Sequence, residues 1–510
     1  MSAGETTSER IARYEQYLST SHLGKNLKRS SVRGGIAMVG ATTATFIIGL
    51  AGTAVTARLL PPRDFGLLAM VATLTRLVEQ FKDMGLAMAT VQRSQITHQQ
   101  VSYLFWVNTA IGVVAALFTA LSAPLLAWFY GEPELNLITL ALATAFAVSG
   151  IGVQHQALLQ RRLQYRSIAV LRVLATGLGT AAGVLAAMGG WGYWSLVVMQ
   201  LGTAAAQSAL GWLFSPWRPT WVGDDVPDKR SLVAFGGQIT AARFLVFITR
   251  NLDNVLIGKV WGDEALGLYA KAYQILMLPV QRLINPLTSV VVPALSRLQN
   301  DQRAYISYYQ KALRTLSTLS MPVVVLCFIA APELIGVVLG ENWTGAVRIF
   351  QYLAPAAFAG SLNPTAWAWI SLDQADRMLR WNMIATPVNV AAFVVGVPFG
   401  PEGVAIAFSA VQLVLRYFSV WYCFRGNFLS MGVLMAAVWH PTVAALAAGV
   451  LVWASASALV PPLPLPLLFA LKGAYYTLVY LGIWLLLPGG AGALRETALL
   501  VREIRGKRKS

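Results

Sequence analysis

The chain has 510 residues, of which 56% are hydrophobic and only 12% are charged, and its mean hydropathy is +0.59. Because a soluble protein needs about 25% charged residues to cover its surface, this composition excludes a soluble enzyme, a nucleic-acid-binding protein and a disulfide-rich secreted protein. It predicts an all-α polytopic membrane protein. The net charge of +17 is read as a topology signal, since the basic residues lie beside hydrophobic blocks.

Residues 1–33 form a polar and basic segment without an apolar run. A secretory signal peptide needs a short hydrophobic core followed by small residues at a cleavage site, so we expect none here. The next stretch, residues 34–57, is apolar and long enough to span a bilayer. We therefore predict a cytoplasmic N-terminal segment over residues 1–33.

Apolar stretches of about 20 residues, the length that crosses a bilayer as a helix, recur along the chain and predict about 14 transmembrane helices. The first six are expected at 34–57, 65–91, 103–129, 136–158, 168–189 and 193–214. The other eight are expected at 232–258, 266–295, 313–338, 346–371, 381–399, 402–424, 431–457 and 465–488.

The basic residues between these stretches predict an orientation. With a cytoplasmic N-terminus, 26 Lys and Arg residues lie on the cytoplasmic side, and only Arg58, Arg63 and Lys259 lie on the other. Cytoplasmic loops carry such an excess, so we expect an even number of helices with both termini in the cytoplasm. The aromatic and basic segment 303–311 is typical of an interfacial amphipathic helix.

Two stretches of the sequence repeat each other at an offset of 201 residues, namely 58–69 and 259–270. The alignment pairs Gly66 with Gly267, although chance similarity between apolar helices is the alternative explanation. Six predicted helices separate the copies, so both have the same orientation. Parallel repeats predict two six-helix lobes related by an axis along the membrane normal, with a substrate site between them.

The predicted organisation of the chain follows from this repeat. The N-lobe is expected over 34–214, a cytoplasmic linker over 215–231 and the C-lobe over 232–424. Two extra helices are expected over 431–488 and a basic cytoplasmic tail over 489–510.

Charged residues also lie inside the predicted helices, where each costs about 2.5–3.5 kcal/mol or more to insert. The basic ones that we assign to a substrate-binding cavity, together with two polar neighbours, are Arg76, Lys82, Arg243, Arg250, Arg282, Asn251 and Asn254. Further basic residues in the later helices are Arg348, Arg416 and Lys472. Basic residues outnumber acids inside the predicted helices, which indicates a chamber for an anionic substrate. Guanidinium groups are suited to such a substrate because they bind phosphate bidentately.

The acids in these helices are Glu79, Asp83 and Asp253. Arg76, Glu79 and Asp83 are spaced by three and four residues and therefore share one helix face. The acids are candidates for coupling transport to protons or sodium. The alternative interpretation is that they only form salt bridges that hold helices together.

Several motifs resemble those of Wzx-type flippases of the polysaccharide transport family. They are the stretches 58–70, 83–86, 92–93, 129–133, 250–254 and 293–297. The Arg-Asn-Leu-Asp-Asn stretch at 250–254 is the most specific of them. The similarity extends over residues 30–490 and is greatest to the WzxC-like branch, within the multidrug/oligosaccharidyl-lipid/polysaccharide superfamily.

The resemblance implies a V-shaped fold of two lobes in the bacterial cytoplasmic (inner) membrane. The implied function is to flip a polyprenyl-diphosphate-linked oligosaccharide across that membrane for exopolysaccharide or lipopolysaccharide biosynthesis, by alternating access. The expected partners are this lipid-linked substrate, membrane lipids and polysaccharide polymerase or export machinery, with no nucleic acid. The resemblance implies no catalytic residues.

Three alternatives remain open from the sequence. A multidrug exporter or a peptidoglycan-precursor exporter belongs to the same superfamily, although the usual cationic cargo of multidrug exporters suits a cationic chamber poorly. A membrane glycosyltransferase or polymerase would need a large catalytic loop, and the longest internal loops have about 17 residues. We expect a transporter rather than an enzyme, without cofactor or bound metal.

Overall fold

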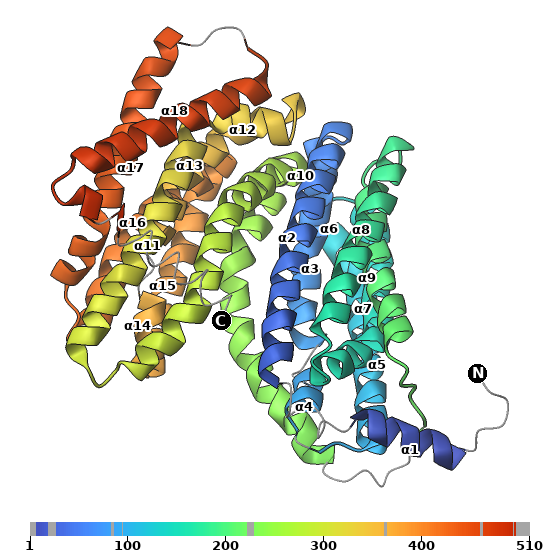
Figure 1. Cartoon of the computed structure of the whole chain (residues 1–510). Coiled ribbons are helices and arrows are strands. Elements are labelled where there is room, and N and C mark those ends of the chain that lie inside the picture. Colours follow the sequence, from blue (N-terminus) through green and yellow to red (C-terminus); the bar gives the residue numbers. More distant parts are fainter. Residues whose placement is uncertain are drawn as a thin grey trace. The chain divides into compact units, whose positions relative to one another are not determined.

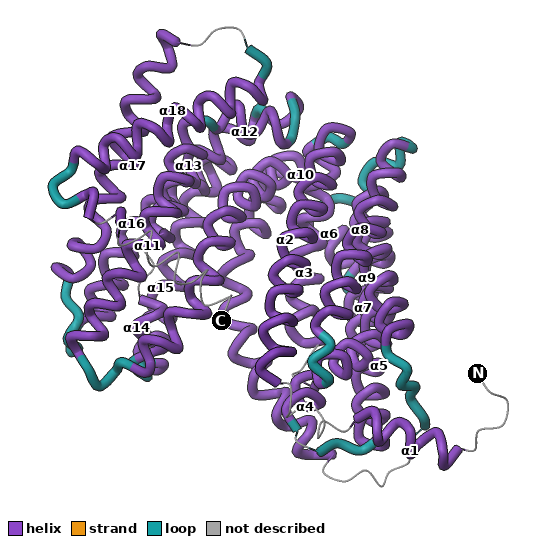
Figure 2. Tube along the Cα trace, viewed as in Figure 1, coloured by secondary structure: helices purple, strands orange, loops and turns teal. Residues whose placement is uncertain are grey.

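The computed structural model describes residues 7–18, 27–82, 86–93, 95–221, 229–361, 365–459, 463–492 and 494–495. Throughout these ranges the regular structure is helical and no strand occurs (Figures 1 and 2). Contacts divide the chain into two compact units, residues 1–264 and 265–510.

The first unit contains the helices α1 (Thr7–Leu18), α2 (Leu27–Leu59), α3 (Pro62–Lys82), α4 (Leu86–Gln92), α5 (His98–Leu121), α6 (Ala123–Tyr130), α7 (Glu134–Arg161), α8 (Tyr165–Met188) and α9 (Trp194–Phe214). The long α10 (Lys229–Arg297) begins in this unit and ends in the second. It is not one continuous helix, because Gly262 adopts a non-helical conformation with φ of 81°. That backbone conformation is open to glycine and strained for other residues.

The second unit continues with α11 (Gln302–Ile329), α12 (Ala331–Val338), η2 (Glu341–Trp343), α13 (Gly345–Ser361), α14 (Thr365–Ser371) and α15 (Ala375–Gly396). It ends with η3 (Val397–Phe399), α16 (Gly400–Phe424), α17 (Met431–Leu459) and α18 (Leu465–Leu486).

Ten stretches within the described residues are long and apolar enough to cross a membrane. The protein is therefore an all-helical, multi-pass membrane protein, as its composition predicts. One of the ten, Ala375–Phe424, covers two of the predicted spans. The count of fourteen spans and the two-lobe arrangement stay predictions.

The structure divides four predicted helices, among them 313–338, which is divided into α11 and α12 at Ala330. The predicted helix 103–129 is divided into α5 and α6 at Ser122, where Pro124 lies in the first turn of the new helix. The predicted helices 65–91 and 346–371 correspond to pairs of helices, α3 with α4 and α13 with α14.

Close helix packing in the first unit depends on small residues. α5 and α7 meet at Gly112 and Gly150, and a Cβ atom on Gly112 would lie 2.8 Å from the carbonyl oxygen of Phe146. Because a membrane offers little hydrophobic drive for helix association, such close backbone approach supplies much of the packing energy.

The N-terminal segment contains a helix that the sequence does not predict. Tyr14 and Leu18 of α1 are buried against the first unit. Arg161 donates to the carbonyl oxygen of Leu18 at 3.1 Å, and Arg162 donates to that of Tyr17 at 3.1 Å. These two arginines satisfy carbonyl groups that a helix C-terminus leaves without partners.

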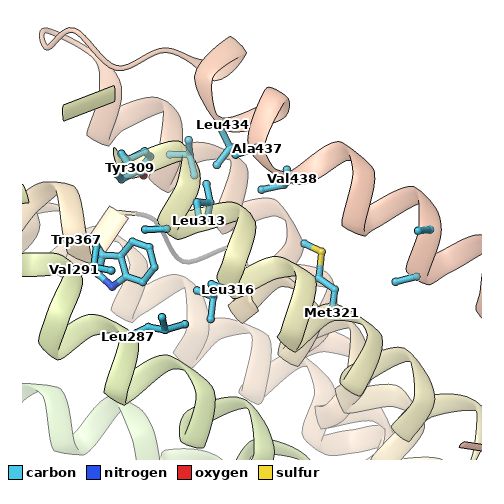
Figure 3. Close-up of a cluster of buried hydrophobic side chains, with 14 of the residues drawn as sticks. Leu287, Val291, Tyr309, Leu313, Leu316, Met321, Trp367, Leu434, Ala437 and Val438 are labelled. Carbon is cyan, nitrogen blue, oxygen red and sulfur yellow. The ribbon is translucent and has the colours of Figure 1, made fainter. Parts of the chain in front are cut away.

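The core of the second unit joins α10, α11, α14 and α17 (Figure 3). Its labelled members are Leu287, Val291, Tyr309, Leu313, Leu316, Met321, Trp367, Leu434, Ala437 and Val438. Tyr305 and Tyr309 are fully buried at the start of α11. The segment 303–311 is the first part of α11, and Tyr305 and Tyr309 pack into the core while Arg303 and Lys311 are exposed; its interfacial position stays a prediction.

Aromatic residues spaced four apart attach α18 to the rest of this unit. Tyr476, Tyr480 and Trp484 are buried along one face of α18. The Tyr476 hydroxyl donates to the carbonyl of Ala445 on α17 at 3.1 Å, and the Tyr480 hydroxyl donates to that of Thr318 on α11 at 3.1 Å. The last two long helices are thus built into the core of the second unit.

Candidate functional site

α3 has one apolar face and one charged face. Leu67, Val71 and Val78 are buried, and Val78 packs against Ala115 of α5 and Phe146 of α7. These buried positions are spaced by four and seven residues, the period of one helix face. They fix α3 against the bundle of the first unit and turn its other face away from it.

Arg76 and Glu79 lie on that other face and are both exposed. Within the described part of the chain, no ion pair or hydrogen bond holds either side chain. If α3 spans the membrane, as the sequence predicts, its charged side chains avoid lipid and face protein or a water-filled space. An exposed guanidinium group in this position is therefore suited to bind an anion that enters from water.

The Asn251–Asn254 segment of α10 is partly buried. Asn251 and Asp253 are buried, at 8% and 6% exposure, and both interact with other residues of the chain. The Asp253 carboxylate accepts a hydrogen bond of 2.9 Å from the backbone N–H of Asn254. Asn254 itself is half-buried.

Arg282 lies in the second unit, on the part of α10 that follows Gly262. Its side chain is exposed and has an interaction partner in the protein. Asp83 lies outside the described residues, and so do the side chains of Lys82, Arg243 and Arg250. The structure thus describes Arg76, Glu79, Asn251, Asp253, Asn254 and Arg282 among the predicted site residues, and it places Arg76 and Glu79 on one face.

The later cations of the predicted membrane set have different environments. Lys472 of α18 forms an ion pair with Glu333 of α12, with 2.6 Å between Nζ and Oε1. Arg416 is half-buried and has a partner within the protein, whereas Arg348 is exposed on α13. The sequence did not single out Glu333, because it is 139 residues from Lys472 and no local spacing connects them.

A chain of buried polar side chains in the first unit was also missed. The Asn108 amide donates to Oε1 of Gln154 at 3.2 Å, and Nε2 of Gln154 donates to Oγ1 of Thr90 at 2.7 Å. About two turns further along α7, the buried Arg161 donates to the carbonyl oxygens of Thr90 at 2.9 Å and Arg93 at 2.5 Å. These contacts fix α4, which follows the charged face of α3, against α5 and α7.

Comparisons with known proteins agree with this architecture. The family model described as "Polysaccharide biosynthesis protein" matches residues 55–348. The lipopolysaccharide biosynthesis protein WzxC of Escherichia coli is 24% identical over 407 residues, which cover 77% of this chain and 81% of WzxC. The succinoglycan biosynthesis transport protein ExoT of Rhizobium meliloti is 24% identical over 384 residues, covering 75% of this chain and 74% of ExoT.

Among solved structures, the lipid II flippase MurJ in an inward closed conformation matches with a TM-score of 0.69 and 13% sequence identity. The match covers 88% of this chain and 98% of that one. At this identity the similarity establishes a shared fold and nothing about the substrate.

Proposed function

Since the chain belongs to the family of polysaccharide biosynthesis proteins, we propose that it is a transporter that flips a polyprenyl-diphosphate-linked oligosaccharide across the bacterial cytoplasmic membrane. The multi-pass helical fold supports transport, and ExoT is named as a transport protein. MurJ, which shares the fold, is named as a flippase. The proposed role is in exopolysaccharide or lipopolysaccharide biosynthesis, as a transporter rather than an enzyme.

The observation that carries this proposal is the exposed guanidinium group of Arg76 on a helix whose opposite face is buried. A diphosphate offers several charged oxygens to such a group, and guanidinium binds them in a bidentate, strongly directional way. A cationic drug would be repelled by Arg76, so this residue favours an anionic cargo over the cargo of a multidrug exporter.

In the proposed mechanism, the diphosphate and the sugars occupy a water-filled chamber while the polyprenyl tail stays in lipid. The chamber cations are Arg76, Lys82, Arg243, Arg250 and Arg282, with Asn251 and Asn254 as polar neighbours. Two lobes then move against each other and expose the chamber to the other side of the membrane. Both termini lie in the cytoplasm, and the flipped product is passed to a polymerase or export machinery.

The acids divide into two groups in this proposal. Glu79 is exposed beside Arg76 and is therefore the acid best placed to bind a coupling ion. Asp253 is buried and engaged by other residues, which supports a structural role for it. Asp83 lies outside the described residues, and its coupling role is proposed from the sequence alone.

Reconstitution into proteoliposomes tests the function. Three fluorescent cargoes are compared: a polyprenyl-diphosphate oligosaccharide, a lipid-linked peptidoglycan precursor and a cationic drug. We expect the first to become accessible to an external quencher or glycosidase faster than in protein-free vesicles, and the drug not to accumulate. Movement of the drug but of neither lipid-linked cargo would contradict the proposal. Movement of the peptidoglycan precursor alone would contradict the proposed oligosaccharide substrate and identify the protein as a peptidoglycan-precursor flippase.

A further inference from the structure

Arg63, at the start of α3, is held by three carboxylates. Its Nε donates to Oδ2 of Asp263 at 2.8 Å, and its Nη2 donates to Oε1 of Glu134 at 3.0 Å. The same Nη2 lies 3.6 Å from Oε2 of Glu132. The acids come from two other connections of the first unit, the α6–α7 turn and the kink inside α10.

The backbone at this kink fits closely against α3. A Cβ atom on Gly66 would lie 1.7 Å from the carbonyl oxygen of Asp263, so only a glycine allows this approach. On the other side, the Lys259 amine donates to the carbonyl oxygen of Phe129 and lies 5.0 Å from the centre of its ring. The kink of α10 is thus held against the start of α3 and against the end of α6.

The contact joins the two copies of the sequence repeat. Arg63 and Gly66 belong to the stretch 58–69, and Lys259 and Asp263 belong to the stretch 259–270. Both stretches lie on the side of the membrane that the distribution of basic residues assigns to the outside. Any motion that separates the two repeats on this side must break the ion pair of Arg63 with Asp263 and the close approach at Gly66.

The ion pairs have the properties of a reversible contact. The Arg63 side chain is 52% exposed, and an exposed ion pair contributes little and is weakened by salt. Three carboxylates around one guanidinium leave the cluster with excess negative charge, so its members partly repel each other. A contact of this kind stabilises the closed conformation only weakly, so the protein can leave it reversibly.

We propose that Arg63, Gly66, Lys259, Glu132, Glu134 and Asp263 form an outer latch, which closes the outside of the transporter in one state and opens in the other. The inference rests on the proposed alternation of two repeats, and it adds the residues that hold one side closed. Opening separates the α10 kink from α3 and from the α6–α7 turn.

Pulsed electron–electron double resonance measures the latch without any substrate. Spin labels on cysteines at Trp128, 77% exposed, and Val260, 55% exposed, report the distance between α6 and the kink, in a background with Cys327→Ser and Cys423→Ala. In nanodiscs we expect a short distance to dominate in the parent protein. Arg63→Ala should lower the ratio of latched to unlatched molecules by about fivefold, the upper range for an exposed pair.

Glu264→Gln is the matched control, because it removes a negative charge next to Asp263 from an exposed residue outside the ion-pair cluster. It should leave the distribution unchanged. Raising the salt concentration on the parent protein, which needs no substitution, should shift it in the same direction as Arg63→Ala. An unchanged distance distribution in both Arg63→Ala and high salt would overturn the latch.

The two proposals fail separately. If the labelled protein shows the salt-dependent distance but no lipid-linked oligosaccharide is flipped in vesicles, the latch stands and the proposed function fails. If flipping is observed while the distance stays fixed in all variants, the function stands and the latch is wrong.

Discussion

Lys472 of α18 and Glu333 of α12 form a buried ion pair, with 2.6 Å between Nζ and Oε1 and side-chain exposures of 13% and 10%. Lys472 also donates to the carbonyl oxygen of Ile329 at 3.2 Å. Removing one partner leaves the other charge buried without compensation, which costs about 3–5 kcal/mol. This pair therefore connects the last helix of the second unit to α12, and a single substitution of either residue should lower the stability of the protein.

Lys472→Met should lower the thermal unfolding temperature of the purified protein clearly, whereas the double variant Lys472→Met with Glu333→Leu should restore most of the loss. The reason is that a buried pair replaced by two apolar residues is often neutral. Differential scanning fluorimetry in one detergent measures both. A double variant that is as unstable as the single one would show that packing, and not charge, holds α18.

Arg161→Ala should release α1 and α4 together. One guanidinium group satisfies the carbonyl oxygens of Leu18, Thr90 and Arg93, and a buried group left without its partner costs about 1–3 kcal/mol. Hydrogen exchange measured by mass spectrometry should rise in both helices. Arg166→Ala, an exposed arginine at the start of α8, is the control and should leave both helices protected; equal exchange in the two variants would contradict the role of Arg161.

Gly66→Ala should force the α10 kink away from α3 without changing any charge. The new Cβ atom would lie 1.7 Å from the backbone oxygen of Asp263, which cannot move as a flexible side chain does. We expect a shift toward the unlatched distance between labels at Trp128 and Val260. Gly177→Ala meets nothing within 4 Å and should have no such effect, and identical distances in the two variants would refute the close contact.

The latch should become more populated as the pH falls from neutral. Burial and the neighbouring carboxylates of Asp263 and Glu134 raise the pKa of Glu132 above its ordinary value of 4.5, although Arg63 opposes the shift. Burial likewise raises the pKa of Asp64. A carboxyl group whose pKa is raised in one state binds protons more tightly there, so protonation favours the latched state over one in which these groups are solvated.

The latched fraction should increase as the pH decreases through the raised pKa of Glu132 toward its ordinary value of 4.5. Glu132→Gln should increase the latched fraction at neutral pH and reduce its pH dependence. The label-to-label distance between positions 128 and 260 at several pH values measures this. A latched fraction that falls steadily on acidification would mean that loss of the Arg63 ion pairs outweighs relief of repulsion.

The sequence predicts the all-helical membrane fold and the family, because both depend on composition, apolar length and local motifs. It does not predict the packing of α1, since Tyr14 and Leu18 are buried against residues far away in the sequence and Arg161 and Arg162 bond to the end of this helix. Nor does it predict the break at Ser122. The apolar stretch continues through Pro124, so hydropathy alone does not show that one helix ends and another begins there.

The helix face that carries Arg76 and Glu79 can be predicted from the sequence. Spacing places Arg76 and Glu79 on one face of a helix, and they lie on the exposed face of α3. Pairing between distant segments could not be read from spacing, as Glu333 with Lys472 and Arg63 with Asp263 illustrate. The roles of the predicted cavity residues in substrate binding stay predictions.

The role of Arg76 is the central claim, and flipping of a fluorescent polyprenyl-diphosphate oligosaccharide in proteoliposomes tests it most directly. A charged hydrogen bond contributes about 1.5–3 kcal/mol, so Arg76→Ala should slow flipping by about tenfold to a hundredfold. Arg76→Lys should lose less, and Arg166→Ala should flip at the parent rate at equal reconstituted amounts. An Arg76→Ala variant that flips as fast as the parent protein would contradict the account.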